Sequence, residues 1–122
     1  MPKIAISCDE PTLDAKIDPR FGRAAGFLIV DPDTMDFQYL DNGTSQTMAQ
    51  GAGIQAAELV AQSGAKFVLT GFVGPKAFTA LSAAGIQVAE KLENVTVREA
   101  VEQFKAGKVQ IARQPNKQGH WS

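Results

Sequence analysis

The chain alternates short apolar runs with amphipathic stretches, and turns rich in glycine and proline separate them. The run from Lys3 to Ser7 predicts a buried strand, and a long polar loop follows it over residues 9–25. Phe27–Val30 and Phe37–Leu40 predict an antiparallel hairpin, because the turn Asp31-Pro32-Asp33-Thr34 joins them with proline at its second position. The second strand of this hairpin is the more polar, so we expect it at an edge of the sheet.

Apolar positions then recur at the spacing of about 3.6 residues that is typical of an amphipathic helix. The first helix is expected over residues 53–63, and Gly64 ends it. Its predicted inward positions are Ile54, Ala57, Val60 and Ala61. The continuous apolar run Phe67–Leu69 predicts a parallel strand that is covered on both faces.

Two further helices are predicted in the second half of the chain. Pro75 suits the first position of one, and the short strand Ile86–Val88 follows it. Thr96 and Glu99 form a capping box that starts the other, which Gly107 ends. The predicted inward positions of these helices are Ala77, Phe78, Leu81, Ala84, Val97, Ala100, Val101 and Phe104.

The order of these elements predicts the fold class. A helix between the hairpin and the next strand is a right-handed crossover that joins parallel strands. We therefore expect a three-layer α/β fold with a mostly parallel, five-stranded sheet and one antiparallel strand, the topology of a ribonuclease-H-like motif. We expect one domain over residues 1–107 and a polar C-terminal tail over residues 108–122, in which Val109–Ile111 could form a short extended piece outside the five-stranded sheet. Topology alone does not indicate nuclease activity.

Composition excludes several classes of protein. The 122 residues include 12 Lys and Arg against 13 Asp and Glu, and a net charge of −1 argues against a general nucleic-acid or membrane binder. A single cysteine, Cys8, excludes an intrachain disulfide and a zinc site built on several thiolates. The N-terminus enters a strand pattern at once and no apolar run is long enough to span a membrane, so we expect a cytoplasmic protein.

The charge is nevertheless divided between the two parts of the chain. Residues 1–50 hold eight acids and four bases, whereas residues 51–122 hold five acids and eight bases. This asymmetry is either chance combined with an acidic hairpin or the mark of an interaction surface.

Three segments are expected to meet at the carboxyl ends of the parallel strands, where open α/β sheets bind ligands. They are the loop that starts at Ser7-Cys8-Asp9, the helix start Gln50-Gly51-Ala52-Gly53, and the turn from Thr70 to Lys76. The backbone N–H groups and the dipole of a helix N-terminus favour anions. Lys76 adds a cation, and Arg20 and Arg23 reach the same place from the long loop. We call this the candidate anion site.

Soft metal ligands are sparse. Cys8 is either a soft ligand or redox thiol, or a small half-buried hydrophobic residue. Met48 is either a thioether ligand or a packing residue. His120, beside Trp121, belongs either to a solvated tail or to a lid or copper ligand that folds back over the site.

Two enzymatic motifs are weak. Gly51-Ala52-Gly53-Ile54-Gln55-Ala56 matches a dinucleotide-binding fingerprint in letters, but the residues before it are polar and do not form the required strand. The acids at Asp9, Glu10, Asp14 and Asp18 crowd one loop, whereas a two-metal nuclease needs carboxylates from several strands. We interpret these acids as a solvated loop.

A set of short motifs runs along most of the chain. They are Lys3-Ile4-Ala5-Ile6, Arg20-Phe21-Gly22-Arg23-Ala24, Phe27-Leu28-Ile29-Val30-Asp31, Gly51-Ala52-Gly53-Ile54-Gln55-Ala56-Ala57, Thr70-Gly71, Gly74-Pro75-Lys76-Ala77, Leu81 and Ala84-Gly85-Ile86. Together, over residues 3 to about 107, these motifs resemble the dinitrogenase iron–molybdenum cofactor biosynthesis family. The chain is most similar to the small stand-alone members of that family.

The resemblance implies a ribonuclease-H-like fold and binding of a metal–sulfur cluster or its precursor. In such families the cluster is of the iron–molybdenum cofactor type or is a molybdenum–copper sulfide, and these clusters are anionic. Our hypothesis is a non-enzymatic carrier that holds the cluster mainly through backbone N–H groups, Arg and Lys. The expected cluster-binding residues are Cys8, Arg20, Phe21, Gly22, Arg23, Gly51, Ala52, Gly53, Thr70, Gly71, Phe72, Val73, Gly74, Pro75 and Lys76, with Cys8, Met48 and His120 as candidate metal ligands.

Two other functions stay open at this point. One is a protein-interaction module that works with an ATPase, a division-related complex or cluster-assembly proteins. The other is an enzyme acting on a small phosphorylated substrate, for which the sequence offers no paired acid and base in the candidate anion site.

Overall fold

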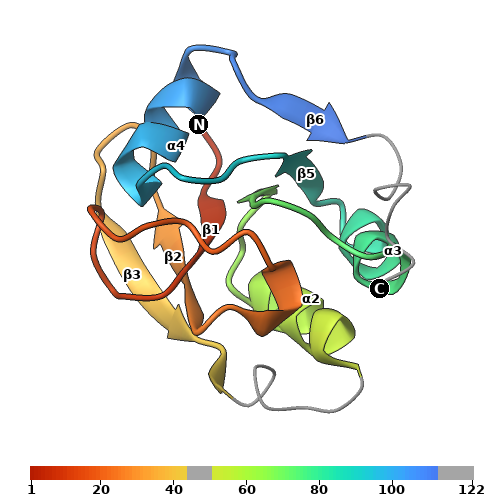
Figure 1. The fold of residues 1–122 in the computed structure, drawn as a ribbon. Helices are drawn as coiled ribbons and strands as arrows, with labels where there is room; N and C mark the ends of the chain where they lie inside the picture. The colour runs from red at the N-terminus through yellow and green to blue at the C-terminus, as the bar shows by residue number, and fades with distance from the viewer. Residues whose placement is uncertain (44–50, 113–122) are drawn as a thin grey trace.

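The computed structural model describes residues 1–43 and 51–112 as a three-layer α/β structure with a central sheet (Figure 1). The strands are β1 (Ile4–Cys8), β2 (Gly26–Val30), β3 (Phe37–Asp41), β4 (Phe67–Leu69), β5 (Gln87–Glu90) and β6 (Gln110–Ala112). The helices are the 3-10 turn η1 (Phe21–Arg23) and the α-helices α2 (Ala52–Gln62), α3 (Pro75–Ala83) and α4 (Val97–Lys105). No described helix is long and apolar enough to cross a membrane.

The strands lie in the order β3-β2-β1-β4-β5-β6. β1, β4 and β5 are parallel neighbours, and the pairs β1–β2, β2–β3 and β5–β6 are antiparallel. The hairpin and the edge position of β3 are therefore as the sequence predicts. The parallel strands β1 and β4 have their carboxyl ends on the same side of the sheet, and this is the side that carries the candidate anion site.

The sheet differs from the prediction in its size and in its reversed strands. It has six strands instead of five, and two of them, β2 and β6, run against the rest. The extra strand, β6, lies in the segment that we assigned to the polar tail, and it pairs with β5 through the register Ala89↔Ile111. A strand of three residues with mostly exposed side chains carries little apolar signal. The ribonuclease-H-like assignment and the domain boundary at residue 107 stay predictions.

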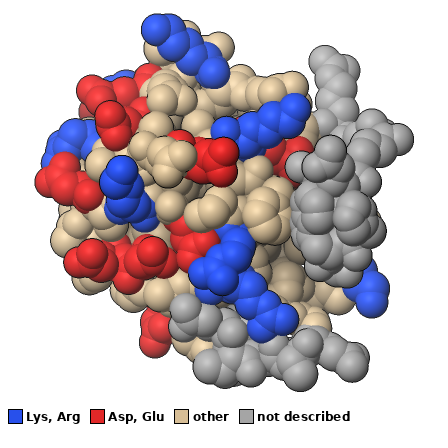
Figure 2. All heavy atoms as spheres, in the orientation of Figure 1, with Lys and Arg blue, Asp and Glu red and all other residues tan. Residues whose placement is uncertain are grey.

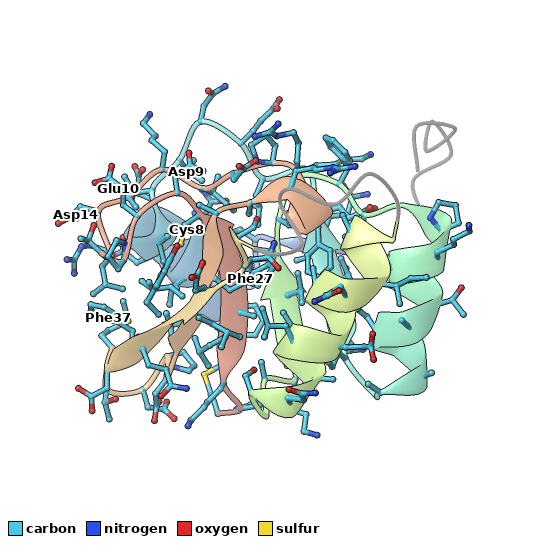
Figure 3. The ribbon with its side chains drawn as sticks, turned by 90° about the horizontal axis from the view of Figure 1, so that it is seen from below. Cys8, Asp9, Glu10, Asp14, Phe27 and Phe37 are labelled. Atoms are coloured by element: carbon cyan, nitrogen blue, oxygen red, sulfur yellow. The ribbon has the colours of Figure 1, made fainter. Side chains whose placement is uncertain are left out.

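Two apolar cores lie on opposite faces of the sheet, and β1 contributes to both. Ala5 packs with residues of α2 and α3, including Val60 and Leu81. Ile4 and Ile6 pack on the other face with α4, whose Val97, Ala100 and Val101 are fully buried. In Figure 3 the sheet is seen on edge, with α4 on one side and α2 and α3 on the other. Every residue of β1 is buried, as the opening apolar run predicts.

The inward face of α2 differs from the prediction. Ala57 and Val60 are buried as expected, but Ile54 is 39% exposed and Ala61 is also exposed. The small residues Ala52 and Ala56 occupy the buried face instead. Alanines have a weak hydrophobic signal, so the larger Ile54 dominates the sequence pattern although it faces outward. In α3 Ala77 and Leu81 are buried as predicted, whereas Ala84 is exposed.

The capping box at the start of α4 is confirmed. The Thr96 side chain accepts a hydrogen bond from the Glu99 N–H at 3.1 Å, and the Glu99 carboxylate accepts one from the Thr96 N–H at 2.8 Å. Two N–H groups at the helix start are thereby satisfied, and the helix begins at Val97. Phe104, on the inward face, adds an edge-on ring contact with Phe67 at 4.9 Å between centroids.

Replacing the cap residue tests this account. Thr96→Ala removes the acceptor for the Glu99 N–H, and we expect it to lower the free energy of unfolding by about 1 kcal/mol. Thr96→Ser keeps an acceptor oxygen and is the matched control, with a change of less than about half of that value. Urea unfolding followed by circular dichroism measures both, and equal losses for the two variants would contradict the capping role.

Candidate functional site

Three segments meet at the carboxyl ends of β1 and β4, as the sequence predicts. Arg20 and Phe72 form an isolated parallel bridge, which joins the loop after β1 to the loop after β4. The Phe72 N–H donates to the Pro19 carbonyl at 2.9 Å, and the Phe21 N–H donates to the Phe72 carbonyl at 3.4 Å. These backbone contacts fix η1 beside the residues that lead into α3.

Glycines allow the three segments to approach each other this closely. A Cβ atom on Gly22 would lie 2.9 Å from the Gly53 nitrogen, so η1 rests directly on the backbone at the start of α2. A Cβ atom on Gly53 would lie 3.0 Å from the Ala77 Cβ, so the starts of α2 and α3 touch. A Cβ atom on Gly71 would overlap Pro19, at 2.4 Å from its Cβ. The glycines thus have a steric role, whether or not a ligand is bound.

The N-termini of α2 and α3 are the source of positive potential. The residues before them are Gly51, with a left-handed φ of 76°, and Gly74, and neither supplies a side-chain cap. The first-turn N–H groups of these helices therefore donate no hydrogen bond to a cap side chain. Since Gly53 contacts Ala77, the two helix starts point their dipoles at one neighbourhood. This arrangement favours an anion.

The cations around this neighbourhood are not equivalent. Arg20 is paired with the buried carboxylate of Asp18, because its Nε lies 3.3 Å from one carboxylate oxygen and its Nη2 lies 3.2 Å from the other. Lys76 is exposed at the second position of α3, and Arg23 ends η1. Figure 2 shows basic side chains over η1, below the centre of the view. Lys76 and Arg23 are therefore exposed cations of this neighbourhood, and the charge of Arg20 is offset in part by Asp18.

An acidic group borders the site on the side of β1. Burial raises the pKa of Asp9, and its hydrogen bond with Asp18 and the charge of Asp18 raise it further, while Arg20 opposes the shift. In Figure 2 acidic side chains gather on the left, over the loop after β1 and towards β3. The acidic loop predicted from the sequence is therefore tied to the site through the pair formed by Asp18 and Arg20.

The aromatic and apolar candidates divide between the surface and the core. Phe21 and Val73 are 2% and 1% exposed, and Phe21 packs on Phe27 with ring centroids 5.2 Å apart. Phe72 is partly exposed, and Ile54, in the first turn of α2, is exposed. Phe72 and Ile54 are therefore the members of this group with exposed apolar surface, and the sequence analysis assigned only Phe72 to the site.

The structure places Cys8 away from the helix N-termini. Its side chain is buried in the core between the sheet and α4, with Ala15 and Ile17 of the covering loop, on the opposite face from Phe27 (Figure 3). Burial raises the pKa of the Cys8 thiol to about 11, although hydrogen bonds involving the backbone of Leu28 and Glu10 oppose this shift. The thiol is therefore protonated at neutral pH, a state that disfavours metal ligation.

Met48 and His120 lie outside the described residues. Within residues 1–43 and 51–112, no group of three or more His, Cys, Asp or Glu side chains is placed to hold a metal ion. The part of the site that the structure describes therefore offers N–H donors and cations.

Polar residues beneath the site were missed by the sequence analysis. The hydroxyl of the buried Ser7 donates to the Asp18 carbonyl at 2.6 Å and lies 2.8 Å from the hydroxyl oxygen of the buried Thr70. This network ties the ends of β1 and β4 to the loop that carries Arg20. The sequence signal that could have indicated this network was a serine, Ser7, within an otherwise apolar strand. Thr70 was predicted as a cluster-binding residue. In the structure its hydroxyl belongs to the network that supports the site from below.

Glu90 is a second missed residue. Its carboxylate accepts a hydrogen bond from the Val73 N–H at 3.3 Å, and its side chain is 8% exposed. Burial raises the pKa of Glu90, while the Val73 hydrogen bond and the charge of Lys91 lower it. Glu90 thus positions the loop between β4 and α3 from below. Glu90 ends the short strand β5, and no pattern in the sequence predicts that its carboxylate positions the next loop.

Together these features define a small α/β protein with an anion-favouring site at two converging helix N-termini. The family model described as dinitrogenase iron-molybdenum cofactor matches residues 2–107, and the chain belongs to this family. The resemblance inferred from the sequence motifs is confirmed.

Solved structures support the assignment. The apo form of the orange protein from Desulfovibrio gigas is 57% identical, with a TM-score of 0.93 over 96% of this chain and 98% of that one. A putative NifB protein from Thermotoga is 28% identical, with a TM-score of 0.83 over 98% and 100% of the two chains. An uncharacterized protein of Methanocaldococcus jannaschii is 27% identical over 88% of this chain and 89% of its own length.

The burial of Cys8 predicts slow chemical modification. At pH 8 a thiol with a pKa of about 11 holds about a hundredfold less thiolate than an ordinary cysteine, and thiolate is the reactive form. We expect iodoacetamide to alkylate the folded protein at least about a hundredfold more slowly than the protein in guanidinium chloride. Mass spectrometry measures the two rates, and comparable rates would show that Cys8 is accessible.

The burial of Glu90 predicts a pH-dependent stability difference. Because the folded-state pKa of Glu90 is raised, its stabilising protonated form is lost as the pH rises through that value. Glu90→Gln stays neutral and keeps an oxygen for the Val73 N–H. We therefore expect the variant to gain unfolding free energy relative to the native protein as the pH increases from acidic to neutral. Urea unfolding across this range tests it against the exposed control Glu93→Gln, and a constant difference at all pH values would contradict it.

Proposed function

We propose that this protein is a non-enzymatic carrier of an anionic, molybdenum-containing metal–sulfur cluster or of its precursor. The cargo is a molybdenum–copper sulfide or a cluster of the iron–molybdenum cofactor type. The observation that carries the proposal is the convergence of the starts of α2 and α3, neither of which has a side-chain cap, at the Gly53–Ala77 contact. Family membership and the 57% identity to the orange protein support the choice of cargo.

Sulfide-rich anions suit this set of groups. Their charge is offset by the backbone N–H groups of Gly53 and Lys76 and by the side chains of Lys76 and Arg23. Their polarisable sulfides pack against apolar side chains, and Phe72 and Ile54 supply these at the site. Such binding needs no cysteine ligand, which agrees with the burial of Cys8 on the other face of the sheet.

A carrier role is favoured over catalysis by what the titratable groups near the site already do. Asp18 is committed to Arg20, and Glu90 accepts the Val73 N–H. A general acid or base needs a group that exchanges its proton with substrate. The proposal therefore assigns Asp18 and Glu90 to support of the site.

A carrier must receive and deliver its cargo, so we place this protein among cluster-assembly proteins in the cytoplasm. The likeness to a putative NifB protein supports this context. An ATPase partner is compatible with the role and stays a prediction from the sequence.

Reconstitution tests the proposal. Purified apoprotein is mixed with tetrathiomolybdate and copper(I), desalted, and examined by visible absorption and elemental analysis. We expect a protein-bound chromophore that contains molybdenum. A parallel mixture of tetrathiomolybdate with iron(II) and sulfide distinguishes the two cluster types. Absence of any bound molybdenum in both mixtures would overturn the proposal.

Charge variants test the position of the site. We expect Lys76→Gln and Arg23→Gln each to weaken cluster binding about tenfold, because each removes one charge-assisted contact. The matched control is Lys66→Gln, since Lys66 is exposed and precedes β4, at the opposite end of the strand. Arg20 is not suited to this test, because its removal leaves the buried Asp18 without its partner. Equal affinities for the variants and the control would place the cluster elsewhere.

A further inference from the structure

The outer edge of β3 has no partner in the part of the chain that the structure describes. β3 is the terminal strand of the sheet, and its register with β2 runs without a bulge from Gly26↔Asp41 to Val30↔Phe37. In Figure 1 β3 lies at the left border of the molecule.

The register shows which backbone groups of β3 point outward. The Asn42 N–H donates to the Ala25 carbonyl, and the Asp31 N–H donates to the Asp36 carbonyl. In an antiparallel ladder such hydrogen-bonded pairs recur at every second residue, so Gln38 and Leu40 also bond to β2. The N–H and C=O groups of Phe37, Tyr39 and Asp41 therefore face away from the sheet. They form a row of donors and acceptors that suits a further strand.

The edge lacks the usual structural protection against strand addition. Phe37–Asp41 contains no proline and no lysine, and neither a bulge nor a described segment covers it. Phe37 is 44% exposed, which is unusual for a phenylalanine side chain on an edge strand. Its exposed ring offers apolar surface beside the outward backbone groups.

The charge of the hairpin determines what can bind there. No Lys, Arg or His occurs between Ala24 and Ala65, whereas the hairpin carries Asp31, Asp33, Asp36 and Asp41. Only one of these carboxylates has a described cationic partner, since Asp33 lies 2.7 Å from the amino group of Met1. The carboxylates of Asp31 and Asp41 accept hydrogen bonds from backbone N–H groups of their own turns.

The neighbouring loop adds further acids on the same side. In Figure 3 Asp9, Glu10 and Asp14 lie on the side of the molecule that carries Phe37. Asp14 is paired with Arg98 at 3.2 Å, while Asp9 and Glu10 extend the negative surface. The hairpin itself therefore carries four acids and no base around the exposed ring of Phe37.

We propose that the outer edge of β3 is the docking surface for an extended, basic segment of a partner protein, which adds to the sheet as a further strand. Backbone groups of Phe37, Tyr39 and Asp41 supply the ladder, and the aspartates select lysine and arginine. A second copy of this chain fits poorly. Antiparallel pairing of two β3 strands about Tyr39 brings the aspartates of both hairpins together.

The ladder also predicts the pattern of the partner segment. Phe37, Tyr39 and Asp41 share one face of the sheet, because side chains alternate along a strand. Partner residues opposite Phe37 and Tyr39 pack on aromatic rings, and a basic residue fits opposite Asp41. A segment with alternating apolar and basic residues meets both requirements.

A peptide of alternating lysine and valine is the probe, and a peptide of alternating glutamate and valine is its control. We expect the lysine peptide to bind at least tenfold more tightly and to lose affinity as salt increases. Hydrogen exchange on the native protein identifies the surface. The amides of Phe37, Tyr39 and Asp41 should gain protection, while those of Gln38 and Leu40, already in the ladder with β2, should change little.

Two variants separate the backbone from the side chain. Phe37→Ala keeps the outward N–H, whereas Phe37→Pro removes it at the first residue of the strand, where proline is tolerated. We expect Phe37→Pro to bind the lysine peptide several-fold more weakly than Phe37→Ala does. The double variant Asp36→Asn, Asp41→Asn should weaken binding and flatten its salt dependence.

Three outcomes would overturn the inference. The first is equal affinity for the lysine and glutamate peptides, and the second is amide protection that falls outside β3. The third is concentration-dependent dimerisation through β3 in sedimentation experiments, which would assign the edge to a second copy. The exchange measurement uses the unmodified protein, so it decides the matter even if a variant fails to fold.

Discussion

The site depends on one constraint, the close approach of η1, α2 and α3 at two glycines. A Cβ atom on Gly22 would collide with the backbone of Gly53, and a Cβ atom on Gly53 would lie 3.0 Å from the Ala77 Cβ, closer than an ordinary van der Waals contact. The same closeness brings two helix starts together, so their dipoles add at one point instead of acting at separate places. On the other side Gly71 against Pro19 fixes the loop from β1. The chemistry of the site is therefore set by packing, and larger residues at these positions would separate the groups that attract an anion.

The electrostatics of the site follow from what is buried beneath it. Asp18 is paired with Arg20, and Glu90 lies under the loop between β4 and α3. These two buried acids offset part of the positive charge that the arginines and lysines bring to the site. The N–H groups at the starts of α2 and α3 have fixed directions, and the exposed side chains of Lys76 and Arg23 add positive charge. Fixed dipoles need no reorganisation when a ligand arrives, and they impose no ligand bond on a metal. Such a site attracts an anion without forming a covalent or coordinate bond to it.

The elements were predicted correctly where the periodicity of apolar residues and the residues of the turns indicate the same element. The hairpin, the strand β4 and the capping box of α4 all have strong local signals, and the structure has them where predicted. The prediction was wrong about Ile54, because the buried face of α2 is built from alanines, and it missed β6 as a member of the sheet. In the site, the sequence placed the three segments together but not the partners of their side chains. The position of Cys8 depends on which face of β1 its side chain takes, and the short spacing of Asp18 and Arg20 does not by itself show that the carboxylate is buried beneath the guanidinium.

The division of charge along the chain now has a structural explanation. The acids of the first part of the chain lie in the loop after β1 and in the hairpin at the β3 edge, whereas the starts of α2 and α3, with Lys76, meet at the contact of Gly53 with Ala77. Acidic side chains beside the helix starts would weaken the attraction for an anion. Because the acidic region and the helix starts are separate, one small domain can present surface charge of both signs. An anion approaching the acidic border is repelled, and one approaching the helix starts is attracted. The position of the acids therefore contributes to selectivity for the helix starts, although no acid there needs to contact the ligand.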